Sequence, residues 1–152
     1  MRFLSPGQIK LLRAGAVSML DIIIPVYNEE AILQERKQYY QALKTRARII
    51  FVDGGSSDQT PILAAKYGDV IHCEKGRGLQ KNCGAKKADG KHLLFLHVDT
   101  CVDAEALAAV EQAMEQGVKA GCFTLKIDDP GLAFSIFARI INFRARHFNI
   151  ID

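Results

Sequence analysis

Short apolar runs alternate along this chain with segments that carry helix signals, and this alternation constrains the fold more than any other feature. The clearest run is LDIIIPV at residues 20–26, whose β-branched side chains are typical of a buried strand. Further strands are expected at residues 47–52, 69–73, 91–98 and 120–127, and helices at 5–15, 29–44, 56–67, 78–88, 103–116 and 132–148. Because strands and helices alternate, the sequence predicts an α/β fold: a mostly parallel sheet flanked by helices on both faces.

Polar residues follow three of these expected strands. They lie at residues 25–29, 53–58 and 97–100, and they include Tyr27, Asn28, Glu29, Asp53 and Asp99. An acid after one strand is often only a turn residue or a helix cap. In a parallel sheet, however, ligands bind outside the carboxyl ends of the strands, so three such clusters together predict one binding crevice.

Asp99 has the clearest chemistry of this set. A carboxylate at the end of a buried strand suits Mg²⁺ or Mn²⁺, held together with a substrate diphosphate whose charge the metal neutralises. His97 offers a softer nitrogen ligand, and on an apolar strand it is also consistent with a core side chain. Arg77 and Lys81 lie one helical turn apart and offer donors for phosphate, but they are equally consistent with a solvated basic helix face.

Composition and charge exclude several classes of protein. Hydrophobic residues make up 49% and charged residues 24% of the 152 residues, which excludes a disordered chain and fits one domain. The net charge of +3 is too small to indicate a nucleic-acid-binding protein. No apolar run approaches the ~20 residues of a membrane span, and neither a P-loop nor G-x-G-x-x-G follows a strand. The cysteines, Cys73, Cys83, Cys101 and Cys122, form no C-x-x-C pair, and we expect free thiols in a reducing, cytoplasmic setting.

Four motifs, taken in order, resemble those of family 2 glycosyltransferases of the GT-A fold. They are IPVYNEE at residues 24–30, VDGGSSDQT at 52–60, RGLQKNCG at 77–84 and LFLHVDT at 94–100. The resemblance covers about residues 19–150, and the ordered set is more specific than any one motif. The His-x-Asp-Thr form looks most like a bacterial subgroup of transferases that are associated with radical-SAM and selenoprotein-domain neighbours.

The resemblance implies a Rossmann-like fold that binds a nucleoside-diphosphate sugar and transfers the hexosyl-type sugar with inversion to an unknown acceptor, which in many members is lipid-linked. The residues that it assigns to the donor are Pro25, Tyr27, Asn28, Glu29, Asp53, Gly54, Arg77, Lys81 and Asp99. By this resemblance, Pro25, Tyr27 and Glu29 line the base and ribose. Asp53 would hydrogen-bond the base, and Arg77 matches the basic position that contacts the nucleotide.

Two departures from the family pattern bear on catalysis. Asp99 matches the last acid of the D-x-D motif that binds Mg²⁺ or Mn²⁺, but His97 stands where the first acid is expected. No residue is found for the catalytic base, and the chain stops at Asp152. We therefore expect a C-terminally truncated transferase, with residues 1–18 as an N-terminal extension and 19–152 as the donor-binding domain.

Two other functions stay open at this point. The missing base favours a nucleotide-binding or interaction domain without catalysis. A nucleotidyltransferase shares the fold, although no loop rich in Gly, Arg and Lys follows the first strand. The last expected helix, 132–148, carries Phe, Ile and Arg residues. It is expected to pack in the core or in a homo-oligomer seam, and contact with a membrane surface is its alternative.

Overall fold

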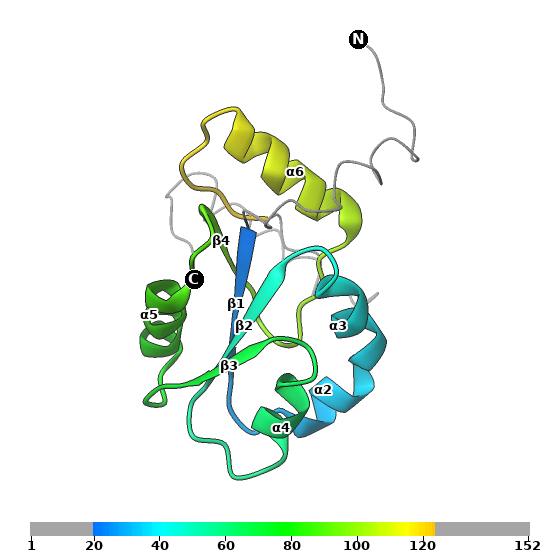
Figure 1. The fold of residues 1–152 in the computed structure, drawn as a ribbon, viewed down its shortest axis with the longest axis vertical. Coiled ribbons are helices and arrows are strands. Elements are labelled where there is room, and N and C mark those ends of the chain that lie inside the picture. The colour runs from blue at the N-terminus through cyan, green and yellow to red at the C-terminus, as the bar shows by residue number, and fades with distance from the viewer. Residues whose placement is uncertain (1–19, 124–152) are drawn as a thin grey trace, which may run out of the picture. The chain divides into compact units, whose positions relative to one another are not determined.

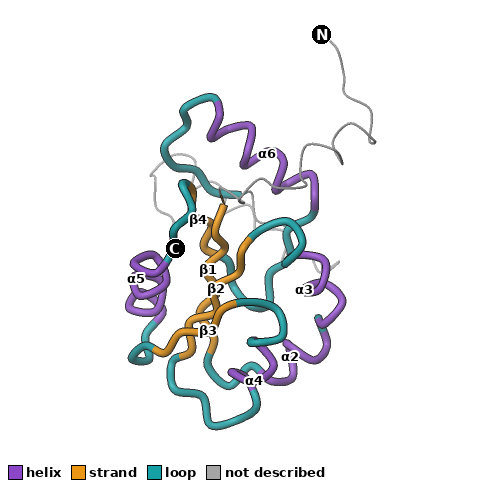
Figure 2. Tube along the Cα trace, viewed as in Figure 1, coloured by secondary structure: helices purple, strands orange, loops and turns teal. Residues whose placement is uncertain are grey.

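The computed structural model describes residues 20–123, which form a parallel sheet with helices around it (Figures 1 and 2). The strands are β1 (Leu20–Val26), β2 (Arg48–Asp53), β3 (Asp69–His72) and β4 (His92–Phe95). The helices are α2 (Glu30–Glu35), α3 (Lys37–Leu43), α4 (Thr60–Ala64), α5 (Arg77–Lys87) and α6 (Ala104–Glu115). The chain divides into two compact units between Ala108 and Ala109, and the first unit holds the whole described sheet.

The described sheet has the order β3-β2-β1-β4, and all its strand pairs are parallel. The chain adds β2 and β3 on one side of β1, and after α5 it crosses to the other side, where β4 pairs with β1. Figure 1 shows α5 on one face and α2, α3 and α4 on the other. The predicted α/β fold, with a parallel sheet and helices on both faces, is confirmed.

One face of the sheet packs against α5 through a small apolar cluster. Ile23, Ile50 and Val52 are buried there, with side chains of α5 packed against them. Gly84 lets the helix come this close, because a Cβ at that position would lie 2.4 Å from Ile23 Cγ2 and 3.0 Å from Val52 Cγ2. A side chain at Gly84 would therefore push α5 away from the carboxyl ends of β1 and β2.

The other face buries aromatic side chains. Tyr40 of α3 is fully buried and packs edge-on against Phe51 of β2, with the ring centroids 5.5 Å apart, and it also contacts Tyr67. Its hydroxyl donates a hydrogen bond of 2.7 Å to Val98 O. Burial of the ring thus also fixes the segment that follows β4.

Several expected boundaries are corrected. The helix predicted over 29–44 is two helices, because the backbone leaves helical geometry at Arg36 (φ −95°, ψ 21°). The strand predicted over 91–98 stops at Phe95, since after a bond from Leu96 N to Ile23 O the chain turns at His97. The helix predicted from residue 56 begins at Thr60, and residues 120–123 form no strand.

The expectation that all four cysteines are free thiols is wrong for one pair. Cys73 and Cys83 form a disulfide with their Cα atoms 6.5 Å apart, whereas Cys101 and Cys122 are free and exposed. Spacing did not reveal the pair, because the two positions meet only through the turn from β3 into α5.

Other predictions fall outside residues 20–123. They are the N-terminal helix and extension, strand residues 124–127 and the last helix with its seam or membrane contact. Among the helices of the described part, none is both long and apolar enough to cross a bilayer.

Candidate nucleotide-sugar site

Two loops at the carboxyl edge of the sheet are bound to each other by side chains. Asn28 N donates to Ser56 Oγ (2.9 Å), and Asn28 Oδ1 accepts from Ser57 N (2.9 Å). Glu29 N donates to Thr60 Oγ1 at 2.7 Å. Asn28 adopts a left-handed backbone (φ 53°), which Asn tolerates better than most residues. The loop after β1 is therefore held in shape by the loop after β2.

Asp58 holds the starts of two helices at once. Its Oδ2 accepts from Glu30 N (3.2 Å) at the start of α2, and its Oδ1 accepts from Thr60 N (2.9 Å) at the start of α4. Burial alone would raise the pKa of Asp58, but the hydrogen bonds from Thr60 and Glu30 outweigh it and lower the pKa. Helix α4 begins at Thr60 with no side-chain bond from its N-cap residue Gln59, and Asp58 instead links the start of α4 to the loop after β1.

Asp53, expected to bind the base, is buried and already has protein partners. Its oxygens accept from Gly55 N (3.1 Å), Ser56 N (3.1 Å) and Ser56 Oγ, and His72 Nδ1 lies 3.2 Å from Oδ2. These contacts shape the turn after β2. A nucleobase would have to compete with these donors, and the hydrogen bond from Asp53 to a base stays a prediction.

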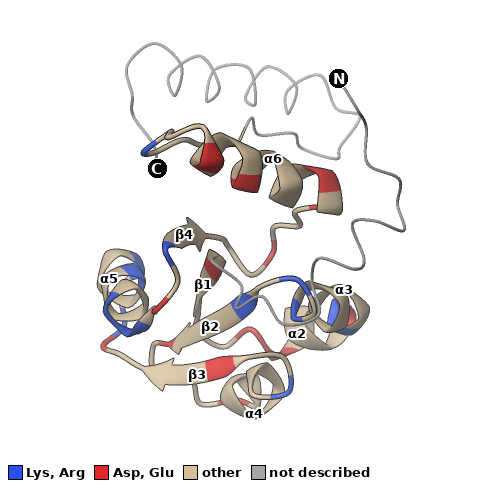
Figure 3. Cartoon of the chain, turned by 45° about the horizontal axis from the view of Figure 1, so that its top comes forward, with Lys and Arg blue, Asp and Glu red and all other residues tan. Residues whose placement is uncertain are grey.

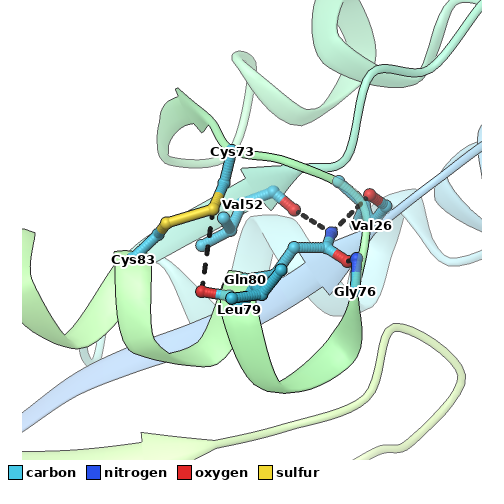
Figure 4. The surroundings of a disulfide bond; sticks show 7 residues. All are labelled: Val26, Val52, Cys73, Gly76, Leu79, Gln80 and Cys83. Carbon is cyan, nitrogen blue, oxygen red and sulfur yellow. Dashed lines mark hydrogen bonds between the residues drawn. A yellow bond between two sulfur atoms is a disulfide. The ribbon is translucent and has the colours of Figure 1, made fainter.

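Gln80 joins the carboxyl ends of β1 and β2 to α5 (Figure 4). Its buried amide Nε2 donates to Val26 O (3.0 Å) and Val52 O (2.7 Å), and its Oε1 accepts from Gly76 N (3.2 Å). Gly54 lies directly against this amide, since a Cβ there would be 3.2 Å from Gln80 Nε2. Gln80 therefore sets where the first turn of α5 stands relative to the strand ends.

Cationic and acidic side chains meet at this edge. Lys and Arg residues lie along α5, as Figure 3 shows. Burial lowers the pKa of His97, positive charge on Lys81 and Arg77 lowers it further, and the Asp99 carboxylate opposes the shift. Lys81, Arg77 and Asp99 therefore each lie close enough to His97 to act on its charge.

Glu29 belongs to the same group of charges. Its pKa is raised first by burial and then by the negative charges of Asp99 and Asp58. Asp99 itself is exposed and accepts a hydrogen bond from Thr100 Oγ1 at 3.2 Å. Glu29 after β1 and Asp99 after β4 are thus close enough for their negative charges to repel each other.

Lys75 is a residue of this edge that the sequence analysis missed. Its ammonium lies 3.7 Å from the centroid of the Tyr27 ring, a cation–π contact between the loops after β3 and β1. Tyr27 keeps 38% of its surface exposed. A search for cations directly after the third strand would have found Lys75.

The remaining predicted residues lie at the same edge. Pro25 is in β1, paired in register with Val52, and Gly54 N donates to Val26 O at 3.0 Å. The predicted donor-site residues thus lie at the carboxyl ends of the strands, except Arg77 and Lys81, which lie in the first turns of α5.

For the metal, the described residues hold no cluster of three or more His, Cys, Asp or Glu ligands. Asp99 and His97 offer at most two donors. This set fits a divalent cation only if phosphate oxygens and water complete the shell, as is usual for Mg²⁺.

Comparison with known proteins agrees with this fold. A model of the family described as glycosyl transferase family 2 matches residues 21–148. An uncharacterized glycosyltransferase of Rickettsia prowazekii, RP339, is 39% identical over 90 residues, which is 53% of this chain and 27% of that protein. TarS of Staphylococcus aureus, a poly(ribitol-phosphate) β-N-acetylglucosaminyltransferase, is 29% identical over 99 residues, or 57% of this chain and 17% of TarS.

Solved structures show the same fold. The crystal structure of TarS 1–349 superposes with a TM-score of 0.54 at 26% identity, covering 64% of this chain and 32% of that one. Glucosyl-3-phosphoglycerate synthase of Mycobacterium tuberculosis, in complex with UDP, superposes with a TM-score of 0.50 at 20% identity, covering 66% of this chain and 40% of that one. This chain spans less than a third of the length of either curated relative. Since the family model matches most of its residues, the chain belongs to glycosyl transferase family 2.

Proposed function

We propose that this chain binds a nucleoside-diphosphate sugar at the carboxyl edge of its sheet and forms the donor side of a sugar transfer. The observation that carries the proposal is that Gln80 fastens the first turns of α5, which bear Arg77 and Lys81, to the ends of β1 and β2 (3.0 and 2.7 Å), at the edge where Glu29 follows β1 and Asp99 follows β4. A diphosphate needs cations, and a metal that accompanies it needs carboxylates. Membership of a glycosyltransferase family supports the same reaction.

The sheet order supports a ligand site at this edge. β1 connects to β2 on one side, and β4 lies on its other side, so the chain changes direction between β1 and β4. In open parallel sheets, the crevice at such a switch point takes the ligand. The loops that border it here are residues 27–29 after β1 and 96–100 after β4, and they carry Glu29 and Asp99.

The proposed contacts divide the donor into three parts. The exposed ring of Tyr27 borders the base, and Arg77 and Lys81 bind the phosphates. The first turn of α5 adds backbone N–H groups, because its N-cap residue Gly76 has no side chain to bind them. Asp99, with His97, would hold Mg²⁺ or Mn²⁺, which supplies Lewis-acid stabilisation of the diphosphate leaving group.

The proposed reaction is a single displacement with inversion. An acceptor hydroxyl attacks the anomeric carbon, the bond to the diphosphate breaks, and a carboxylate takes the hydroxyl proton. None of the described residues is assigned to that last role. A hexosyl-type donor is proposed because TarS, by its name, transfers N-acetylglucosamine.

Calorimetric titration of UDP and GDP, each with and without Mn²⁺, tests the proposal. We expect metal-dependent binding of one nucleotide by the wild type and loss of the metal-dependent part in Asp99→Asn. Asp69→Asn is the matched control, since Asp69 lies at the opposite edge of the sheet and pairs with Arg48 (2.8 Å). The proposal is contradicted if neither nucleotide binds, or if both variants lose binding equally. Binding without transfer from any nucleotide-sugar would instead favour the non-catalytic alternative.

A further inference from the structure

The disulfide between Cys73 and Cys83 encloses much of the proposed phosphate site. Cys73 directly follows β3, where its N–H donates to Asp53 O (2.9 Å), and Cys83 lies in α5. The segment between them carries Lys75, Arg77 and Lys81. Figure 4 shows the bond beside the first turns of α5, with Cys73 Sγ 3.6 Å from Leu79 O. The covalent link thus fixes both ends of a loop that bears three cations.

The two ends of this loop are held unequally by other contacts. The helix end is fastened by the hydrogen bonds of Gln80 and by the close packing of Gly84 on the sheet. The other end, Glu74 and Lys75, is exposed, and Lys75 makes a cation–π contact with Tyr27. Without the disulfide, α5 therefore keeps its place on the sheet, as does Gly76, whose N–H donates to Gln80 Oε1 (3.2 Å), while residues 74 and 75 lose their nearest covalent restraint.

We infer that Cys73 and Cys83 form a thiol–disulfide switch that controls nucleotide binding by ordering residues 74 and 75, which present Lys75 beside Arg77 at the start of α5. The inference rests on the proposed donor site. The disulfide restricts this loop before the ligand arrives, so less conformational entropy is lost on binding. The oxidised form should then bind the diphosphate more tightly than the reduced form.

A low-molecular-weight disulfide, such as glutathione disulfide, supplies the oxidising equivalents. One cysteine thiolate attacks a sulfur of glutathione disulfide, whose S–S bond breaks and releases one glutathione. The second cysteine then attacks the mixed disulfide, forms the bond between residues 73 and 83, and releases the second glutathione. The two thiol protons leave with the two glutathione molecules. Both cysteines are only half-buried, so the reagent can reach them.

The test compares oxidised and reduced protein in a background that carries Cys101→Ser and Cys122→Ser, which removes the free exposed thiols. Alkylation and peptide mass spectrometry first establish the 73–83 bond after treatment with glutathione disulfide. Calorimetry with UDP or GDP, whichever binds, and Mn²⁺ then follows. We expect the oxidised form to bind about three- to tenfold more tightly. Addition of Cys73→Ser and Cys83→Ser should give the weaker affinity under both conditions.

Hydrogen exchange gives a second readout that does not depend on the ligand. Amides of residues 74 and 75 should exchange more slowly in the oxidised form, while those of β1 and β2 stay unchanged. Equal affinities, equal exchange at 74 and 75, or failure of the bond to form would each overturn this inference and leave the donor site standing. Absence of nucleotide binding in both forms would overturn the proposed function, and this inference with it.

Discussion

Replacement of Gln80 by Leu tests how the carboxyl edge is held together. The two side chains have similar size, so the change removes hydrogen bonds without opening a large cavity. Gln80 makes three of them, to Val26 O (3.0 Å), Val52 O (2.7 Å) and Gly76 N (3.2 Å). At about 1 kcal/mol net for each bond, Gln80→Leu should lower the free energy of unfolding by about 3 kcal/mol.

Urea denaturation followed by far-ultraviolet circular dichroism measures this loss. With an m-value of about 2 kcal/mol/M, the midpoint should fall by about 1.5 M. Gln38→Leu is the control, because Gln38 is exposed on α3 and its replacement should change stability by less than about 0.5 kcal/mol. If Gln80→Leu unfolds at the same urea concentration as Gln38→Leu, the buried amide does not hold the strand ends together.

Three further stability predictions use the same assay. Gly84→Ala should lower the free energy of unfolding by about 1–3 kcal/mol, because the added methyl group overpacks the contact with the sheet. Gly78→Ala is the control in the same helix, where the space is open, and it should leave stability unchanged or raise it by up to about 1 kcal/mol. Equal effects of the two substitutions would contradict the close packing of α5. Asp58→Ala should cost about 1–2 kcal/mol at pH 7. Because folding lowers the pKa of Asp58, the difference in stability between the wild type and Asp58→Ala should be complete above pH ~4 and disappear as the pH falls through the lowered pKa. A difference that does not depend on pH would refute the role of the Asp58 carboxylate. Tyr40→Phe should cost about 1 kcal/mol by removing the bond to Val98 O, and an unchanged midpoint would argue against it.

The central strands were predictable because burial on both faces leaves a continuous apolar signal. Strand β1 matches the expected residues 20–26, and β2 is shifted by one residue. The same apolar signal made the predicted β4 too long, since Leu96 and Val98 are buried without belonging to a strand. Leu33, Tyr40 and Leu43 are buried on one continuous run of helix-like spacing, and nothing in that spacing marked the interruption between α2 and α3.

The sequence predicted at which edge of the sheet the candidate site lies, but only some of the contacts that shape it. The topology alone sends the residues after each strand to one edge, which is why Glu29 and Asp99 could be grouped from the sequence. Long-range partners were not predictable. Asp58 looks like a local cap, yet one of its bonds spans 28 positions, and the partners of the Gln80 amide lie 28 and 54 positions away. Such contacts depend on tertiary packing, on which local spacing carries no information.

The most direct test of the account is to locate the bound nucleotide by amide chemical-shift mapping. With 152 residues the chain suits two-dimensional NMR with ¹⁵N labelling, and UDP or GDP with diamagnetic Mg²⁺ is the titrant. The account predicts shifts at the carboxyl edge, in residues 27–29, 54–56, 75–81 and 97–100, and none at the opposite edge, in residues 68–69 and 89–91. Shifts confined to the opposite edge, or no shifts at saturating nucleotide, would contradict the proposed donor site.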